Sequence, residues 1–241
     1  LPLASLFALV AAVRRNLFHA GVFRSNHLPV PVVVVGNLTA GGAGKTPLTL
    51  YLAQALALRG KRPGIISRGY RGSVVAPLHV TADTDPAICG DEPLLLARNA
   101  GVPVFVCPDR SAAGRALLAA YPDVDVLLCD DGLQHYRLAR DIELCVVDGA
   151  RGFGNALPIP AGPLREPVSR LRGVDAVVLN GAGEMPLHAK GFRMQLEPGR
   201  FHVLHDARQT FGANDLAGCK LAAVCGIGNP ARFFASLNAL G

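Results

Sequence analysis

The amino-acid sequence alternates short apolar runs with longer stretches of helical periodicity. Residues 32–35 are consecutive valines within the apolar run 31–38, which is typical of a strand buried in a parallel sheet. Residues 46–60 follow with apolar side chains at helical spacing, and Gly60 provides a stop for that helix. This part of the chain therefore predicts a buried strand that leads directly into a helix.

The same alternation continues toward the middle of the chain. Further strands are expected at residues 62–69, 102–109, 124–132, 141–149 and 174–181, and further helices at residues 91–101 and 111–121. Strands that alternate with helices pair in parallel, because each helical crossover brings the next strand back in the same direction. We predict an α/β fold with a mostly parallel sheet and helices on both faces.

The pattern weakens in two later regions. Residues 150–171 are rich in Gly, Pro and Arg and predict a long surface loop between strands. Residues 191–205 predict a two-stranded ribbon that leads away from the sheet, and residues 220–241 predict a strand and a helix that begin a smaller C-terminal α/β subdomain. We therefore divide the chain into residues 1–28, a core at 29–192, and a ribbon with a truncated subdomain at 193–241.

The N-terminal segment has a character of its own. Residues 1–13 are apolar and are followed by Arg14 and Arg15. A bilayer requires roughly 20 residues, and a signal peptide carries its positive charge before the apolar stretch. The segment favours an amphipathic helix lying on a membrane surface, with arginines near anionic head groups. A helix packed on the domain itself is the alternative.

Composition narrows the class of protein. The 241 residues are 50% hydrophobic and carry a formal net charge of +6, with arginine as the main basic residue. Arginine suits contacts to phosphates or lipid head groups, and codon usage in a GC-rich genome is the alternative explanation for arginines away from a motif. The six cysteines show no CxxC spacing, which indicates a reducing cytosol. Without tryptophan or a basic stripe with interleaved aromatics, nucleic acid is not expected as a partner.

The strongest chemical signal lies between the first strand and the first helix of the core. There the sequence VVVVGNLTAGGAGKT places a Gly-rich turn before a helix, so that backbone N–H groups can surround a phosphate chain. Lys45 would reach the β- and γ-phosphates, and Thr46 would bind Mg²⁺. Thr39 stands where the usual motif has glycine. We predict a P-loop NTPase-like fold whose nucleotide site comprises Thr39, Gly41, Gly42, Ala43, Gly44, Lys45, Thr46 and Pro47.

Three acidic residues are further candidates. The apolar run 124–129 ends in Asp130 and Asp131, where carboxylates beside a P-loop can hold Mg²⁺, although a solvated turn is the alternative for DDG alone. Asp91 begins a predicted helix, either as an ordinary N-cap or as a base for a substrate hydroxyl. After residues 174–180 the chain lacks the NKxD sequence by which related GTPases read guanine, so adenine is expected.

Several blocks together resemble the tetraacyldisaccharide 4'-kinase family of lipid A biosynthesis. They are VVVVGNLTAGGAGKTP, SRGYRG, GDEPLLLA, CDDGLQH, ALPIPAGPLREP and GIGNPARFF, in family order. The resemblance implies Mg²⁺-dependent transfer of the ATP γ-phosphate to the 4'-hydroxyl of an acylated glucosamine disaccharide 1-phosphate. It also implies that the N-terminal segment attaches the enzyme to the cytoplasmic face of the bacterial inner membrane.

The resemblance also implies residue roles. Lys45 and Thr46 would serve nucleotide and metal, Asp130 and Asp131 the Mg²⁺ and catalytic centre, and Asp91 would act as the base. Candidates for binding the sugar 1-phosphate or the nucleotide are Arg68, Arg71, Arg110 and Arg165.

The sequence departs from the family pattern at one place, and two alternative functions stay open. Family members continue into an FPDHH-like motif that this sequence lacks, so we expect the 241-residue form to bind nucleotide but transfer phosphate poorly. A switch-type ATPase of the partitioning or metal-delivery class is one rival, although Ala40 stands where such proteins often carry a lysine. The second rival is a membrane-binding module in which the bound nucleotide plays only a structural part. The oligomeric state is left open.

Overall fold

The computed structural model describes residues 1–186, 190–204, 206–226 and 230–240 of the chain. It contains two compact units, Leu1–Met194 and Gln195–Gly241. The first unit holds the sheet, the P-loop and the N-terminal helix. The second is treated below by itself.

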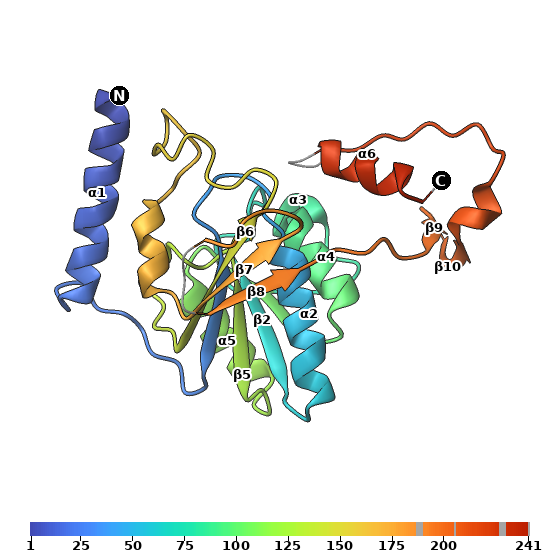
Figure 1. Ribbon diagram of the computed structural model, residues 1–241. Helices are drawn as coiled ribbons and strands as arrows, with labels where there is room; N and C mark the ends of the chain where they lie inside the picture. The colour runs from blue at the N-terminus through green and yellow to red at the C-terminus, as the bar shows by residue number, and fades with distance from the viewer. Residues whose placement is uncertain (187–189, 205, 227–229, 241) are drawn as a thin grey trace. The chain divides into compact units, whose positions relative to one another are not determined.

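An eight-stranded sheet forms the centre of the first unit (Figure 1), in the order β3-β4-β2-β5-β1-β6-β7-β8. Its strands are β1 (Val32–Gly36), β2 (Pro63–Ser67), β3 (Leu78–Val80), β4 (Val104–Val106), β5 (Val126–Asp130), β6 (Ile142–Asp148), β7 (Ala176–Asn180) and β8 (Gly191–Met194). All neighbouring pairs are parallel except β3 with β4. The predicted mostly parallel α/β sheet is confirmed.

Helices cover both faces of this sheet, as predicted. The helices of the core are α2 (Lys45–Leu58), α3 (Pro86–Cys89), α4 (Asp91–Asn99) and α5 (Arg110–Ala120), with a 3-10 turn η1 at Val168–Gly173. Because side chains alternate along a strand, Ile65 packs in the cluster that includes α2 and α4, whereas Ile66 packs in the cluster that includes α5. Both isoleucines are fully buried, as expected for a central parallel strand.

Helix α1 (Pro2–His19) contains the apolar N-terminal segment. Most of its large apolar side chains are exposed, and Ala4 is its buried residue. Near its C-terminal end it contacts the core, where the Arg14 guanidinium donates to the Gln134 carbonyl at 3.4 Å and Phe18 lies beside Tyr136. No helix in the described part of the chain has both the length and the apolar character needed to cross a membrane.

Two predictions for the C-terminal region are wrong in part. Residues 191–194 form β8, which pairs in parallel with β7 and so extends the main sheet instead of leaving it. The two-stranded ribbon forms later in the chain, where β9 (Phe201–Val203) pairs antiparallel with β10 (Asp206–Phe211). The reason is that β7 offers open backbone groups at the sheet edge, and residues 191–194 pair with them before the chain leaves the sheet.

The second unit continues with a 3-10 turn η2 (Ala213–Leu216) and helix α6 (Pro230–Asn238). The helix predicted near the end of the chain is confirmed. The strand predicted over residues 220–230 is not formed at residues 220–226, which are nearly all exposed, and residues 227–229 lie outside the described residues. An apolar run becomes a strand only when a partner strand satisfies its backbone hydrogen bonds.

The sheet topology brings the candidate motifs to one edge. Strands β1 and β5 are hydrogen-bonded neighbours, with Val35 opposite Asp130. Both strands run in the same direction, so the turn after β1 and the acidic turn after β5 leave the sheet side by side. This edge is where α/β proteins with parallel sheets usually bind their ligands.

Candidate nucleotide and phosphoryl-transfer site

The Gly-rich turn connects β1 to α2 in a conformation that needs glycine. Gly44 is the N-cap of α2 with φ of 97°, and Gly41 has φ of 101°, both in the left-handed region. A Cβ at Gly44 would also overlap the side-chain amide of Asn180. Lys45 and Thr46 are the first residues of α2, so the turn ends at the positive end of a helix.

Two asparagines that the sequence analysis did not single out stabilise this turn. Asn180, the last residue of β7, donates from its side chain to the Ala43 carbonyl at 3.0 Å. Asn37 donates to the Gly41 carbonyl at 3.3 Å. A polar residue that closes an apolar strand is the sequence signal that could have identified both positions.

Thr39 stands where the usual motif has glycine, and its backbone is not strained at this position. It is not among the non-glycine residues with positive φ in the described chain, and it forms an antiparallel bridge with Leu164. Hydrogen bonds on either side fix this bridge, from Ala40 N to the Pro163 carbonyl and from Arg165 N to the Leu38 carbonyl, each 2.7 Å long. The predicted surface loop at 150–171 is therefore wrong in part, because Leu164 and Glu166 are buried against the P-loop side of the sheet.

Asp130 is the fully buried last residue of β5. The Thr49 hydroxyl of α2 donates to its Oδ1 at 3.1 Å, while its Oδ2 is buried without a hydrogen-bond partner among the described residues. Burial raises the pKa of Asp130 to about 7. The Lys45 charge opposes this increase, and the Glu92 carboxylate adds to it. A buried carboxylate with a vacant lone pair is an unfavourable group unless a cation binds it.

Asp131 lies in a different environment. Its backbone is in the left-handed region with φ of 50°, and its carboxylate lies 3.6 Å from the Lys45 ammonium. The Arg165 guanidinium donates to both carboxylate oxygens, at 3.0 and 3.2 Å. Burial alone would raise the pKa of Asp131, but Lys45 and Arg165 hold it below its ordinary value, so the side chain is ionised.

These residues fit a magnesium ion better than a transition metal. No group of three or more His, Cys, Asp or Glu side chains capable of holding a metal occurs in the described ranges. Mg²⁺ in phosphoryl-transfer sites is instead held by one or two carboxylates together with substrate phosphates. The residues that could form such a set are Asp130, through its unpartnered Oδ2, Asp131 and Thr46.

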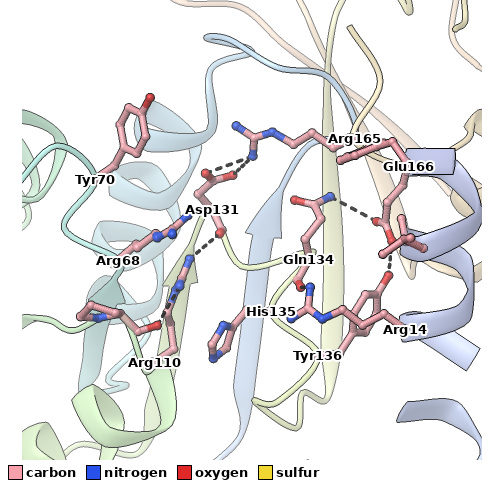
Figure 2. A pocket seen from close by; sticks show the side chains of 14 residues that line it. Arg14, Arg68, Tyr70, Arg110, Asp131, Gln134, His135, Tyr136, Arg165 and Glu166 are labelled. Carbon is pink, nitrogen blue, oxygen red and sulfur yellow. Dashed lines mark hydrogen bonds and ion pairs between the residues drawn. The ribbon is translucent and has the colours of Figure 1, made fainter. Parts of the chain in front are cut away.

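A cavity of about 570 Å³ opens beside Asp131. Its charged wall contains four arginines from separate parts of the chain, Arg14, Arg68, Arg110 and Arg165, as Figure 2 shows. The α1 helix adds an apolar wall of Phe7, Val10 and Ala11. His135 also lines the cavity, but burial and the Arg110 charge lower its pKa to about 4, so the positive charge comes from the arginines.

Of the four arginines that the sequence predicted as ligands of the sugar phosphate or the nucleotide, three line the cavity and one does not. Arg68, Arg110 and Arg165 lie together in the cavity, and Arg110 also donates to the Asp131 carbonyl at 3.3 Å. Arg71 does not line it, and its guanidinium lies 5.7 Å from the ring centre of Tyr70. Arg14, which the sequence analysis considered only as part of the N-terminal segment, joins the cavity because α1 packs beside it.

Asp91 is the exposed first residue of α4, and Gly90 takes the N-cap position. Among the described contacts, Asp91 makes no hydrogen bond or ion pair with the P-loop. Its neighbour Glu92 is nonetheless close enough for its charge to raise the pKa of Asp130. The start of α4 therefore lies near the nucleotide edge of the sheet.

Taken together, a Gly-rich turn between a strand and a helix, with two carboxylates at the end of the neighbouring strand, defines a P-loop nucleotide-binding enzyme, and a cationic cavity lies beside this site. The chain belongs to the tetraacyldisaccharide-1-P 4'-kinase family, whose profile matches residues 1–241. It is accordingly an ATP-dependent kinase.

Individual relatives agree over the whole chain. A tetraacyldisaccharide 4'-kinase of Chromobacterium violaceum is 57% identical over 98% of this chain and 70% of its own length. One of Dechloromonas aromatica is 55% identical over 100% of this chain and 72% of its own length. A crystal structure of LpxK from Aquifex aeolicus in complex with ATP matches with a TM-score of 0.83 and 31% identity, covering 99% of this chain and 76% of that one.

Proposed function

We propose that this kinase transfers the γ-phosphate of ATP to the 4'-hydroxyl of an acylated glucosamine disaccharide 1-phosphate at the cavity beside Asp131. The observation that carries the proposal is the composition of that cavity. It combines four arginines with an apolar wall from α1 and opens at Asp131, whose carboxylate lies 3.6 Å from the Lys45 ammonium of the P-loop. A glycolipid phosphate offers the matching combination of anionic and apolar groups.

On the nucleotide side, the turn at residues 39–44 surrounds the phosphates, and the Lys45 ammonium stabilises negative charge on the transferred group. Thr46, Asp130 and Asp131 would hold Mg²⁺, which when bound would supply positive charge to offset the negative charge of the nucleotide phosphates. The buried Lys45 side chain, with an exposed fraction of 7%, keeps its charge beside the reacting groups instead of in water.

On the acceptor side, the 4'-hydroxyl oxygen attacks the γ-phosphorus, the bond from this phosphorus to the bridging oxygen of ADP breaks, and Asp91 takes the hydroxyl proton. The position of α4 supports this role for Asp91, because the adjacent Glu92 influences Asp130 electrostatically. A carboxylate within hydrogen-bond reach of the acceptor hydroxyl can take up its proton as the bond to phosphorus forms.

Arg68 and Arg71 provide a matched pair for testing the acceptor site. We expect Arg68→Ala to raise KM for the disaccharide about 10-fold, because it removes a charge-assisted hydrogen bond to phosphate worth about 1.5–3 kcal/mol. Arg71→Ala, outside the cavity, is expected to leave KM within about 2-fold. Equal effects of the two substitutions on acceptor KM would contradict the assignment.

The reaction itself is tested by following labelled γ-phosphate from ATP to the disaccharide 1-phosphate in detergent micelles. We expect the lipid to gain the label at its 4'-position, at a low rate with the 241-residue chain. Hydrolysis of ATP without labelled lipid would instead favour the switch-type ATPase, for which the comparisons with known proteins give no support.

We further propose that α1 attaches the enzyme to the cytoplasmic face of the bacterial inner membrane. The support is its row of exposed apolar side chains, Leu3, Leu6, Leu9, Val10 and Val13, followed by Arg14 and Arg15. Apolar side chains enter the acyl boundary while guanidiniums meet anionic head groups. This placement would bring the acyl chains of the acceptor to the apolar wall of the cavity.

Vesicle binding tests the role of α1. We expect the double substitution Leu6→Ser and Leu9→Ser to reduce the fraction bound to vesicles of phosphatidylethanolamine and phosphatidylglycerol about 10-fold, since each leucine loses apolar burial. Neither leucine lines the cavity. Leu58→Ser is the control, because Leu58 is 90% exposed at the end of α2. Unchanged binding of the double variant would rule out this mode of attachment.

A further inference from the structure

A buried network of charged and polar side chains adjoins the acceptor cavity, and two of its members, Tyr136 and Glu166, also line the cavity wall. Its members are Tyr136, Arg140, Glu143, Glu166 and Arg170, and all but Arg140 are buried. Two carboxylates face two guanidiniums, so the formal charges balance. Buried ion pairs of this kind often add little to stability, so their presence calls for another role.

The network begins on the sheet. Glu143 of β6 accepts from Arg140 at 3.0 Å and from Arg170 at 2.5 Å. Arg140 in turn donates to the carbonyls of Leu133 and His135, which flank Gln134 in the turn that begins with Asp131. The backbone of the acidic turn that follows β5 is thereby tied to β6, on the far side of β1 in the sheet.

The other branch ends on Glu166. The Tyr136 hydroxyl donates to Glu166 Oε1, and Arg170 lies 3.9 Å from Oε2 while donating to the Tyr136 hydroxyl at 3.3 Å. Gln134 donates to Glu166 Oε2 at 3.2 Å and to the Asn37 carbonyl at 3.1 Å, where the P-loop begins. A single carboxylate therefore joins the network to the acidic turn and, through Gln134, to the P-loop.

Glu166 also anchors the segment that carries Arg165. The two residues are adjacent, and Arg165 holds both oxygens of Asp131 while its backbone is bonded to Leu38. Figure 2 shows Arg165 reaching Asp131 and Glu166 reaching Gln134 and Tyr136 from the same segment. A shift of the Glu166 side chain would therefore move the partner of Asp131.

We infer that Tyr136 and Arg170 are positioning residues for phosphoryl transfer, which act through Glu166 to hold Arg165 and Gln134 against Asp131 and the P-loop. The inference rests on the proposed function. Misplacement of catalytic groups by about 1 Å can reduce a rate by up to about 10²-fold, whereas nucleotide binding depends on the P-loop backbone and is affected less.

The test compares kcat and KM in Tyr136→Phe, which removes one hydroxyl and keeps the ring. We expect kcat for transfer to the disaccharide to fall about 10-fold with KM for ATP within about 2-fold. Arg170→Lys, which keeps the charge but not the planar group, is expected to lower kcat in the same way. Tyr51→Phe, at an exposed position on α2, should leave both constants unchanged.

Two further variants separate positioning from stability. Val177→Ala destabilises the core of β7 without touching the network, so it should lower Tm while kcat at the assay temperature stays within about 2-fold. In an Arg165→Ala background, Tyr136→Phe should reduce kcat by clearly less than the about 10-fold expected in the wild type, because Arg165, one of the two groups that it positions, is absent.

The outcomes are distinct. An unchanged kcat in Tyr136→Phe, or effects of Tyr136→Phe and Arg165→Ala that multiply fully, would overturn the positioning role while the kinase itself stands. A wild type that transfers no phosphate to the disaccharide would overturn the proposed function, and this inference with it.

Discussion

Lys45→Ala is expected to reduce transfer of the γ-phosphate to the disaccharide by about 10³-fold. The Lys45 ammonium is buried at the start of α2 and lies 3.6 Å from Asp131, where charge on the transferred phosphoryl group develops. Removal of a single preorganised group that stabilises such charge typically costs about 10²–10³-fold in kcat. The initial rate of labelled-phosphate transfer at saturating ATP measures the effect.

Lys61→Ala is the matched control for this substitution. Lys61 is exposed just before β2, at the opposite end of the strands from the P-loop, so its loss should leave the transfer rate within about 2-fold. Lys45→Ala should also keep the circular dichroism and Tm of a folded protein, because alanine is well tolerated in the first turn of a helix. A folded Lys45→Ala protein with undiminished transfer would remove Lys45 from the catalytic centre.

Asp130→Asn is expected to stabilise the nucleotide-free protein while decreasing transfer by at least about 10²-fold. The pKa of Asp130 is raised to about 7 in the folded protein, from near 3.9 when unfolded. Between these two values the unfolded chain binds fewer protons than the folded one. The stability of the wild type therefore falls as pH rises from about 4 to about 7.

Asparagine does not titrate, so Asp130→Asn avoids this loss. The gain should be absent near pH 4 and reach a plateau above pH 7, with an upper bound of about 4 kcal/mol for a shift of about three pKa units. Urea unfolding in the presence of a metal chelator, measured across this range, tests the sign. Activity is lost because the amide cannot supply a charged ligand to Mg²⁺.

The adjacent Asp131 should show the opposite sign. Lys45 and Arg165 hold its pKa below the ordinary value, so its ionised form stabilises the fold and this contribution is lost as pH falls through that low pKa. Asp131→Asn is therefore expected to destabilise the protein at neutral pH. If both substitutions shifted stability in the same direction at pH 8, the electrostatic contrast between the two carboxylates would be wrong.

Much of the sheet followed from the sequence because the signals are local. The four β-branched side chains at 32–35 favour a buried strand, and the alternation of strands with helices favours parallel order. The edges were less predictable. Strand β8 forms because β7 has an open side, and the apolar residues 220–226 form no strand. Pairing depends on a partner that the segment itself does not encode.

The site shows the same division between local and distant information. The sequence by itself determined the P-loop, the acidic turn at 130–131 and the family, because glycine geometry and strand endings are written in neighbouring residues. Only the tertiary structure decided that Asn180 supports the P-loop, that Arg14 joins the acceptor cavity while Arg71 does not, and that Glu166 connects two loops. These are contacts between residues far apart in the chain, and side-chain pairing across such distances is set by how the elements pack, which no local pattern records.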